Sequence, residues 1–256
     1  MKIELAKDTQ KCQKLFKDWE ETMIYSCLDG TMGKIYMDKV ENPQTATAVI
    51  GGFVFYAGKP SLDFLAFKPE NLVGKEVLLC GQTEGWNQLI REFYGENVRE
   101  FTRYAFSKDP NVFDIAYLGN LTEQLPEDFE IKLFDEPIYN QCLTEEWSQD
   151  LVGNYLDFVQ FEQIGLGVAI LHKGQLIAGA SSYTSYKGGI EIEVDTKETF
   201  RKQGLATIVS AKLILECLKR GLYPSWDAHT IYSANLAKKL GYQFSHEYTA
   251  FEVENF

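Results

Sequence analysis

Short stretches of apolar residues mark the first half of the chain, and their spacing predicts several strands and one helix. Residues 46–50 and 53–56 are rich in strand-forming residues and are bounded by glycine, and residues 77–80 form a short apolar run. Residues 23–38 also have the composition of strand-bearing segments. The apolar positions within residues 86–94 recur at helical spacing instead. We therefore expect the first half to be α/β.

The second half begins with alternating residues over 129–134, which are typical of a half-buried strand, and a helical stretch follows them. Residues 167–172 and 175–183 flank Lys173-Gly174, which signals a hairpin. A further strand is expected over residues 190–195. These elements predict an antiparallel meander with helices before it.

A long helix is expected over residues 205–220, with Gly221 as its C-terminal stop. Its polar residues are confined to one stripe, so we expect it to be packed on most of its sides. A strand over 223–228, a short helix over 233–240 and a terminal hairpin that contains residues 240–242 complete the pattern.

The loop before the long helix has the residues of an anion-binding site. Gly204 and Ala206 leave room for a phosphate to approach the main chain, where the N–H groups of a first helical turn carry partial positive charge. Arg201 and Lys202 add cationic donors beside them. The loop lacks the Gly-Lys-Ser/Thr sequence of a P-loop and the Gly-x-Gly-x-x-Gly sequence of a dinucleotide-binding turn. An ordinary strand-to-helix connection explains these residues equally well, so the choice depends on the order of the surrounding elements.

That order of elements resembles one known family. Arg201-x-x-Gly204-x-Ala206 resembles the Gln/Arg-x-x-Gly-x-Gly/Ala acetyl-CoA loop of the GNAT superfamily of N-acetyltransferases. Residues 237–242, Ala-Lys-Lys-Leu-Gly-Tyr, resemble the late helix-to-strand signature of the same family. The resemblance covers residues 129–256 and implies an α+β fold of the GNAT type, the acyl-CoA N-acyltransferase fold.

The resemblance also implies a ligand and its contacts. Acetyl-CoA (coenzyme A) is the expected co-substrate, an amine is the expected acceptor, and direct attack in a ternary complex is the expected mechanism. Neither a metal ion nor a covalent enzyme intermediate is required. The residues that the resemblance places against acetyl-CoA are Val194, Thr196, Arg201, Lys202, Gln203, Gly204, Leu205, Ala206 and Ser233.

The candidate catalytic residues lie on the strand before the loop. Glu191 and Glu193 share one face of this strand by its period of two. The resemblance places the general base nearest Glu193, acting through water. Both glutamates are also readable as solvated strand residues. His229 is a second candidate base, or an ordinary polar residue of a loop.

Two positions depart from the family pattern. Many members carry a tyrosine, four residues before the late glycine, that protonates the leaving thiolate, and here that position is Ala237. An asparagine that often contacts the cofactor corresponds to Thr230. Tyr232, Tyr242 or water are the alternatives for the proton donor. The alanine keeps a second class of function open, namely an acyl-CoA-binding sensor or interaction module with little or no turnover.

The domain division is expected within the polar segment 119–128, which contains Pro126. This predicts an N-terminal α/β domain over residues 1–125 and an acetyltransferase domain over residues 126–256. Residues 27–33 and Trp226-Asp227 extend the resemblance to two-domain acetyltransferases of the zwittermicin A resistance type. That subtype implies that the N-terminal half is a diverged partner domain, and it leaves open that this half is a degenerate GNAT-like copy.

The composition of the chain indicates which classes of binding partner and which compartment to expect. The chain has 37 acidic and 25 basic residues and a net charge of −12, which disfavours binding to nucleic acid or to an anionic membrane and suits a small cationic amine. No apolar run approaches the roughly 20 residues needed to cross a bilayer, and the N-terminus lacks the apolar segment of a signal peptide. The five cysteines are scattered, which fits a reducing compartment. We expect a cytoplasmic protein, with its oligomeric state left open.

Overall fold

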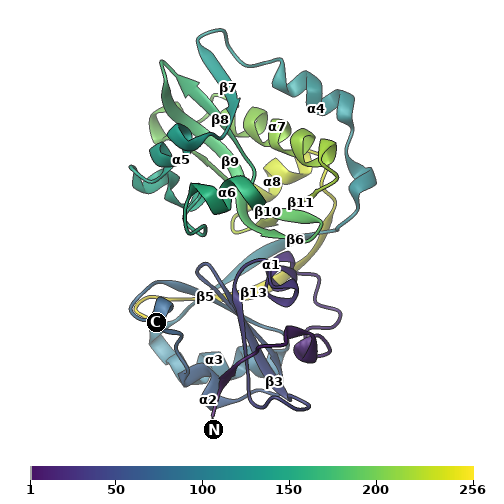
Figure 1. Cartoon of the computed structure of the whole chain (residues 1–256), viewed down its shortest axis with the longest axis vertical. Helices are drawn as coiled ribbons and strands as arrows, with labels where there is room; N and C mark the ends of the chain where they lie inside the picture. Colours follow the sequence, from purple (N-terminus) through teal and green to yellow (C-terminus); the bar gives the residue numbers. More distant parts are fainter. Residues whose placement is uncertain (1) are drawn as a thin grey trace. The chain divides into compact units, whose positions relative to one another are not determined.

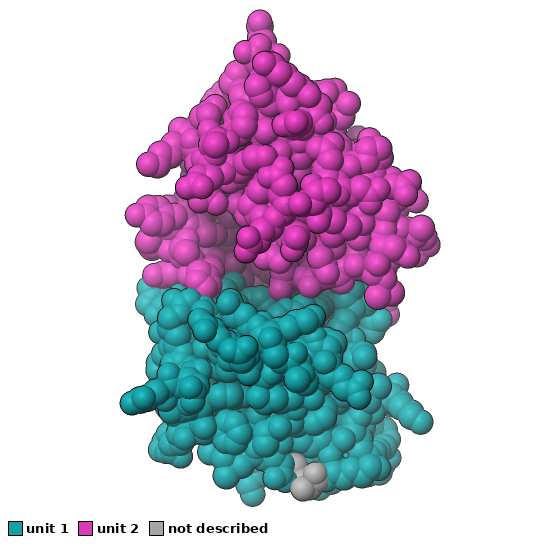
Figure 2. Space-filling view, turned by 90° about the vertical axis from the view of Figure 1, so that its left-hand side faces the viewer, with its two compact units in different colours: residues 1–103, 247–256 teal, residues 104–246 magenta. Residues whose placement is uncertain are grey.

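The computed structural model describes residues 2–256, which form two compact units (Figures 1 and 2). The first unit comprises the chain up to Arg103 together with Glu247–Phe256, and the second comprises Tyr104–His246. The chain leaves the first unit once and returns to it once. The second unit is therefore an insertion within the first.

The first unit is built around a sheet. Neighbouring strands from β1 to β4 are antiparallel, β4 pairs with β5 in parallel, and β13 pairs with the other side of β5. The strands are β1 (Glu4–Leu5), β2 (Lys34–Met37), β3 (Thr45–Ile50), β4 (Phe53–Gly58), β5 (Val77–Gly81) and β13 (Phe244–Val253). The helices are α1 (Thr22–Asp29), α2 (Leu62–Ala66) and α3 (Glu84–Tyr94).

The core of the first unit is aromatic. Tyr56, Trp86 and Phe251 are fully buried in it. The rings of Tyr56 and Trp86 stack with their centroids 5.0 Å apart, and the indole Nε1 of Trp86 donates to the main-chain oxygen of Gly58 at 3.0 Å. These contacts fix α3 against β4.

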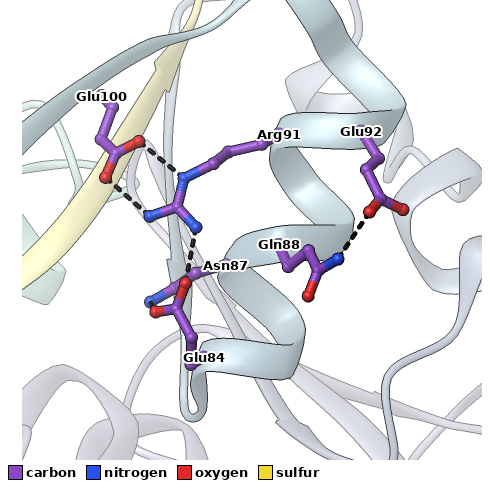
Figure 3. A network of polar contacts seen from close by, with 6 residues as sticks. All are labelled: Glu84, Asn87, Gln88, Arg91, Glu92 and Glu100. Carbon is purple, nitrogen blue, oxygen red and sulfur yellow. Dashed lines mark hydrogen bonds and ion pairs between the residues drawn. The ribbon is translucent and has the colours of Figure 1, made fainter.

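An exposed ion-pair network links α3 to β6 (Arg99–Phe106) on the surface of the first unit (Figure 3). Arg91 donates to the two carboxylate oxygens of Glu100 at 2.8 and 2.7 Å, and to Glu84 at 2.6 Å. These hydrogen bonds raise the pKa of Arg91 and lower the pKa of each glutamate. Exposed pairs of this kind contribute little to stability, so we expect the network to add little to the stability of the first unit.

The second unit has a five-stranded sheet in the order β11-β10-β9-β8-β7. Strands β7 to β10 are antiparallel, and β10 pairs with β11 in parallel. The strands of this unit are β7 (Phe129–Leu133), β8 (Gly167–His172), β9 (Gln175–Tyr186), β10 (Gly189–Thr196), β11 (Tyr223–Ser225) and β12 (Asp227–Ala228). Its helices are α4 (Ile115–Thr122), α5 (Glu136–Cys142), α6 (Phe158–Ile164), α7 (Leu205–Lys219) and α8 (Ile231–Lys239).

Both faces of this sheet are covered (Figure 1). Ala178 and Ala180 of β9 point into the core to which α7 contributes. Gly179, between them, faces the 3₁₀ helix Glu146–Leu151 on the other side. A Cβ at Gly179 would lie 2.6 Å from the Leu151 side chain, so glycine allows this 3₁₀ helix to approach the sheet closely.

The two units repeat one order of elements. Strands β1 to β5 and strands β7 to β11 each make three antiparallel pairings followed by one parallel pairing. The parallel connection passes through α2 in the first unit and through α7 in the second. The N-terminal half therefore follows the same strand plan as the C-terminal half, within an α+β fold.

Most of the strands and the long helices expected from the sequence are present, with limits shifted by a few residues. One expected strand-bearing segment starts as a helix instead. Met23, Ile24 and Cys27 are buried together on α1, and Gly30 ends this helix in the left-handed conformation with φ +75°. The spacing of these apolar residues is helical, which explains the difference.

The C-terminal part departs furthest from expectation. The strand expected over 223–228 is divided at Trp226, whose buried ring enters the core, into β11 paired with β10 and β12 paired with β6. The expected terminal hairpin is absent from the described residues 2–256, because β13 is one strand that ends in the core of the first unit. The expected limit between residues 125 and 126 does not coincide with the limits of the units. Leu118 and Leu121 of α4 are part of the core of the second unit, which explains this difference.

Candidate active site

Strands β10 and β11 run side by side only at their starts. Residues 189–191 pair with residues 223–225, and β11 ends there. Strand β10 continues to Thr196 along β9, and its register with β9 shifts between Glu191 and Ile192. Within residues 2–256, no strand pairs with the far part of β10 on the side that β11 leaves. Because the two strands part, the main-chain groups on one edge of β10 have no neighbouring strand after Glu191 within the described residues.

Two N–H groups on this edge bond locally. The N–H of Val194 donates to the Glu193 carboxylate at 3.1 Å, and the N–H of Thr196 donates to the Asp195 carboxylate at 2.7 Å. The two donors are two residues apart, so they point to the same edge of the strand. Each is satisfied by the side chain of the preceding residue. A ligand carbonyl that replaced the carboxylate would keep the donor satisfied.

The loop that follows β10 turns the chain through two left-handed residues. Lys202 has φ +63° and Gly204 has φ +81°. Among the described residues, no atom lies within 4 Å of the place where Gly204 would carry a Cβ, so the space beside it is open. Arg201 closes the loop, because its Nε donates to the Thr196 oxygen at 3.0 Å and its guanidinium lies 3.7 Å from the Asp195 carboxylate.

The first turn of α7 is electrostatically suited to an anion. Over the part of the chain that the structure describes, no side chain caps this turn and no acidic residue lies in it. Its N–H groups therefore keep their partial positive charge. The ammonium Nζ of Lys239, on α8, lies 3.5 Å from the Thr207 hydroxyl in the same turn. A cation thus stands beside a helix start that already attracts anions.

Carboxylates gather on the face of the sheet opposite α7. Glu191 is buried where β10 still pairs, whereas Glu193 and Asp195 are half-buried farther along. Burial raises the pKa of Asp195, and the nearby Asp150 carboxylate adds to this, while the Thr196 N–H and Arg201 oppose it. Burial also raises the pKa of Asp150, which lies in the 3₁₀ helix that packs on β10.

Helix α8 starts beside the end of β11. The Thr230 hydroxyl caps it by accepting from the Ser233 N–H at 3.2 Å, and the Trp226 indole donates to the Ser233 hydroxyl at 3.1 Å. Ala237 is fully buried in the core, whereas Tyr232 is 83% exposed. Ser233 and the exposed Tyr232 are therefore the residues of α8 whose hydroxyl groups a ligand could contact.

The structure brings most of the expected residues to one region, namely the far part of β10, the loop and the first turn of α7. Leu205 is buried, so it offers only its main-chain N–H, and Gln203 is exposed. Tyr242 is buried and donates to the Pro224 oxygen at 2.6 Å, which removes it from the alternatives for a proton donor. His229 is exposed just before α8.

Sequence reasoning missed three charged residues of this region. Asp195 had a signal, because it follows Glu191 and Glu193 at the same spacing of two. Asp150 and Lys239 had none, because each reaches the site from a distant segment of the chain.

Comparison with known proteins shows the class of enzyme to which this fold belongs. The family model for GNAT acetyltransferase matches residues 13–251, so the chain belongs to the GNAT acetyltransferase family and is an N-acetyltransferase. A relative from Bacillus subtilis (strain 168), described as the uncharacterized N-acetyltransferase YdfB, is 28% identical over 246 residues, which cover 90% of this chain and 89% of the relative.

Solved structures show the same relationship. A GCN5-related N-acetyltransferase-like protein from Streptococcus suis 89/1591 is 52% identical, with a TM-score of 0.90, and the match covers 96% of this chain and 98% of that one. A GCN5-related N-acetyltransferase from Kribbella flavida shares the fold at 14% identity, with a TM-score of 0.53 over 83% of this chain and 87% of that one. No helix within residues 2–256 is long and apolar enough to cross a membrane.

Proposed function

We propose that this N-acetyltransferase uses acetyl-CoA as its donor and transfers the acetyl group to a small cationic amine by direct attack in a ternary complex. The parting of β10 from β11 carries the proposal. It leaves main-chain donors along the edge of a strand that leads directly to the uncapped start of α7. A thioester joined to a diphosphate by an amide-containing arm requires both features in this order.

The residues present fit such a donor molecule. The diphosphate is suited to the first turn of α7, where Gly204 leaves open space and Arg201, Lys202 and Lys239 supply positive charge. The amide-containing arm is suited to the edge of β10, where the N–H groups at positions 194 and 196 are available in exchange for their local carboxylates. One of these main-chain donors would also polarise the thioester carbonyl.

Amine attack requires a base, and we assign this role to Glu193. Its half-buried carboxylate lies on the part of β10 that β11 has left, whereas Glu191 is buried where the strands still pair. The Glu193 carboxylate would take the proton of the attacking ammonium through water. Glu191, two residues away on the same strand, is the alternative.

The acceptor follows from the charge of the site. Asp150, Glu193 and Asp195 supply carboxylates on the same side of the sheet, and the whole chain carries a net charge of −12. Carboxylates attract a protonated amine to the edge of the strand. The resemblance to the zwittermicin A resistance type adds aminopolyol antibiotics to the acceptors that deserve a test, along with aminoglycosides, polyamines, amino acids and protein lysines.

The test has two parts. Thermal unfolding should show that acetyl-CoA raises the midpoint while ATP and NAD do not, because ligands stabilise only the state that binds them. Equal stabilisation by ATP would contradict the donor assignment. A screen for free CoA release over the amine classes should then identify at least one cationic acceptor. Tight CoA binding without turnover on any amine would instead support a sensor.

The base is tested with two matched variants on one strand. Glu193→Gln should lower kcat by about 10²–10⁴ with little change in the KM for acetyl-CoA. Glu191→Gln removes the same charge from the paired part of β10. A loss confined to the Glu191 variant would move the base there. A rise in the acceptor KM alone would show that Glu193 attracts the amine without accepting its proton.

A further inference from the structure

The end of β11 and the start of α8 hold one hydroxyl group in a fixed position. Trp226 follows β11 directly, at the point where this strand stops pairing with β10. Its indole Nε1 donates to the Ser233 hydroxyl at 3.1 Å. The ring is buried and lies against Tyr242, with the ring centroids 5.5 Å apart. The indole N–H therefore has a fixed direction.

The donor of this hydrogen bond is the indole, so the Ser233 oxygen acts as the acceptor. An indole N–H cannot accept, whereas a serine hydroxyl can accept and donate at once. Among residues 2–256, the Ser233 hydroxyl hydrogen has no acceptor. The serine is half-buried, and its main chain is also held, by the Thr230 cap. A positioned hydroxyl is thus left with one hydrogen to donate, and Trp226, which holds it, directly follows the end of β11.

Acyl transfer from a thioester creates a need for such a donor. The bond between the amine nitrogen and the carbonyl carbon forms while the carbon–sulfur bond breaks, and the electron pair of the broken bond moves to sulfur. The proton lost by nitrogen goes to the base and then to water, and the sulfur finally takes a proton from water. Negative charge therefore develops on sulfur before that proton arrives, and a positioned donor stabilises it.

We infer that the Ser233 hydroxyl donates a hydrogen bond to the sulfur of CoA as the thiolate leaves, and that Trp226 is the positioning residue that aims it. The inference rests on the proposed function, because it requires the thioester end of acetyl-CoA to lie where the two strands part. A serine hydroxyl is a far weaker acid than a thiol, so it donates without giving up its proton. Ser233 is in this sense a catalytic residue.

The first test needs no knowledge of the acceptor. A hydrogen bond to the thiolate should lower the pKa of the CoA thiol when CoA is bound, which ultraviolet absorbance of the thiolate measures directly. Ser233→Ala should raise the pKa of the bound thiol by about one unit relative to the wild type. Burial raises the pKa of Cys12 to about 11 and that of Cys27, Cys142 and Cys217 to about 12, so these thiols do not interfere near neutral pH. A titration with desulfo-CoA corrects for the fifth cysteine, Cys80, and for tyrosines.

Kinetics provide the second readout. Ser233→Ala should lower kcat about tenfold, the equivalent of one thiol pKa unit, while the KM for acetyl-CoA changes little. Trp226→Phe should also raise the pKa of the bound thiol, but by less than Ser233→Ala does. The Ser233 hydroxyl remains in this variant but is no longer held by the indole. Ser245→Ala removes an exposed hydroxyl on β13 and is the matched control. We expect no change in the pKa of the bound thiol in this variant.

The outcomes separate the two proposals. If CoA fails to bind the folded wild type, the proposed function fails. If CoA binds but the thiol pKa is the same in the wild type and in Ser233→Ala, this inference alone is overturned. If the pKa of the bound thiol rises in Tyr232→Phe but not in Ser233→Ala, the donor is the exposed tyrosine. That result would also overturn the inference. If Trp226→Phe unfolds, the Ser233 comparison still decides.

Discussion

Gly204→Glu is the most direct test of the phosphate end of the site. Gly204 has φ +81° with open space where a Cβ would lie, so a side chain fits there only at the cost of left-handed backbone strain. Gly221, just beyond the other end of α7, has φ +70° and the same open space. The two positions therefore differ in which end of the helix they occupy, and Gly221→Glu is a matched control.

The stabilities of the two variants follow from this comparison. A non-glycine residue in the left-handed region costs about 1–2 kcal/mol at either position. A glutamate gains about 0.3–1 kcal/mol from the helix dipole near the N-terminus and loses a similar amount near the C-terminus. Without ligand, Gly204→Glu should therefore be the more stable of the two, by roughly 0.6–2 kcal/mol.

Binding should follow the opposite order. Two like unit charges about 6 Å apart repel by about 3 kcal/mol at an effective dielectric constant of about 20. Half of that repulsion, ~1.4 kcal/mol, already weakens CoA binding tenfold. Acetyl-CoA at 100 times the wild-type Kd would then stabilise Gly204→Glu by about 1.4 kcal/mol, compared with about 2.7 kcal/mol for the wild type and for Gly221→Glu.

The assay is thermal unfolding with and without acetyl-CoA, together with calorimetric titration of each folded variant. Gly204→Gln separates charge from strain, because it keeps the strained backbone and removes the repulsion. General damage to the fold would weaken binding most in the less stable Gly221→Glu. Equal CoA affinity in the two glutamate variants would show that the loop does not hold the phosphates.

Two further predictions concern stability. Asp195→Asn should stabilise the protein at neutral pH, because burial and Asp150 raise the pKa of Asp195 and so penalise its charged form in the folded state. This gain should shrink as the pH falls through the raised pKa of Asp195, and parallel stabilities of the two proteins over a pH series of unfolding curves would contradict it. Gly33→Ala should destabilise the first unit by about 3 kcal/mol or more, because its Cβ would lie 2.5 Å from the Cys27 sulfur and 2.7 Å from the Val49 oxygen at φ +76°. Gly30→Ala, at φ +75° with open space, should cost only about 1–2 kcal/mol, and urea unfolding that found equal losses would refute the packing argument.

The strands were predictable because their apolar patterns are local. Residues 167–172 and 175–186 form a hairpin, as the pair Lys173-Gly174 predicts. Both residues of this turn adopt the positive φ that a two-residue hairpin turn requires. The break at Trp226 was not predictable, because a strand-like run conceals that one ring turns into the core. The destination of β13 was also hidden, because pairing with β5 depends on a segment remote in sequence.

The candidate site divides along the same line. The loop from Arg201 to Gly204 was a candidate from its own residues, because small and cationic side chains before a helix suit an anion, but only the order of the surrounding elements favoured this reading over an ordinary connection. The hydrogen bond from Trp226 to Ser233 and the approach of Lys239 to Thr207 were not recognisable. Each depends on how α8 packs in the second unit, and no local spacing specifies that.

The return of the chain to the first unit has a consequence for synthesis on the ribosome. Strand β5 needs β4 on one side and β13 on the other, and β13 emerges only after the second unit has been translated. At a rate of about 5–20 residues per second, the nascent first unit waits for roughly 10–30 seconds with an open edge at β5. Open edges are where chains pair wrongly with one another. The second unit can meanwhile close its own five-stranded sheet, so the catalytic half is expected to fold before the half that precedes it in the chain.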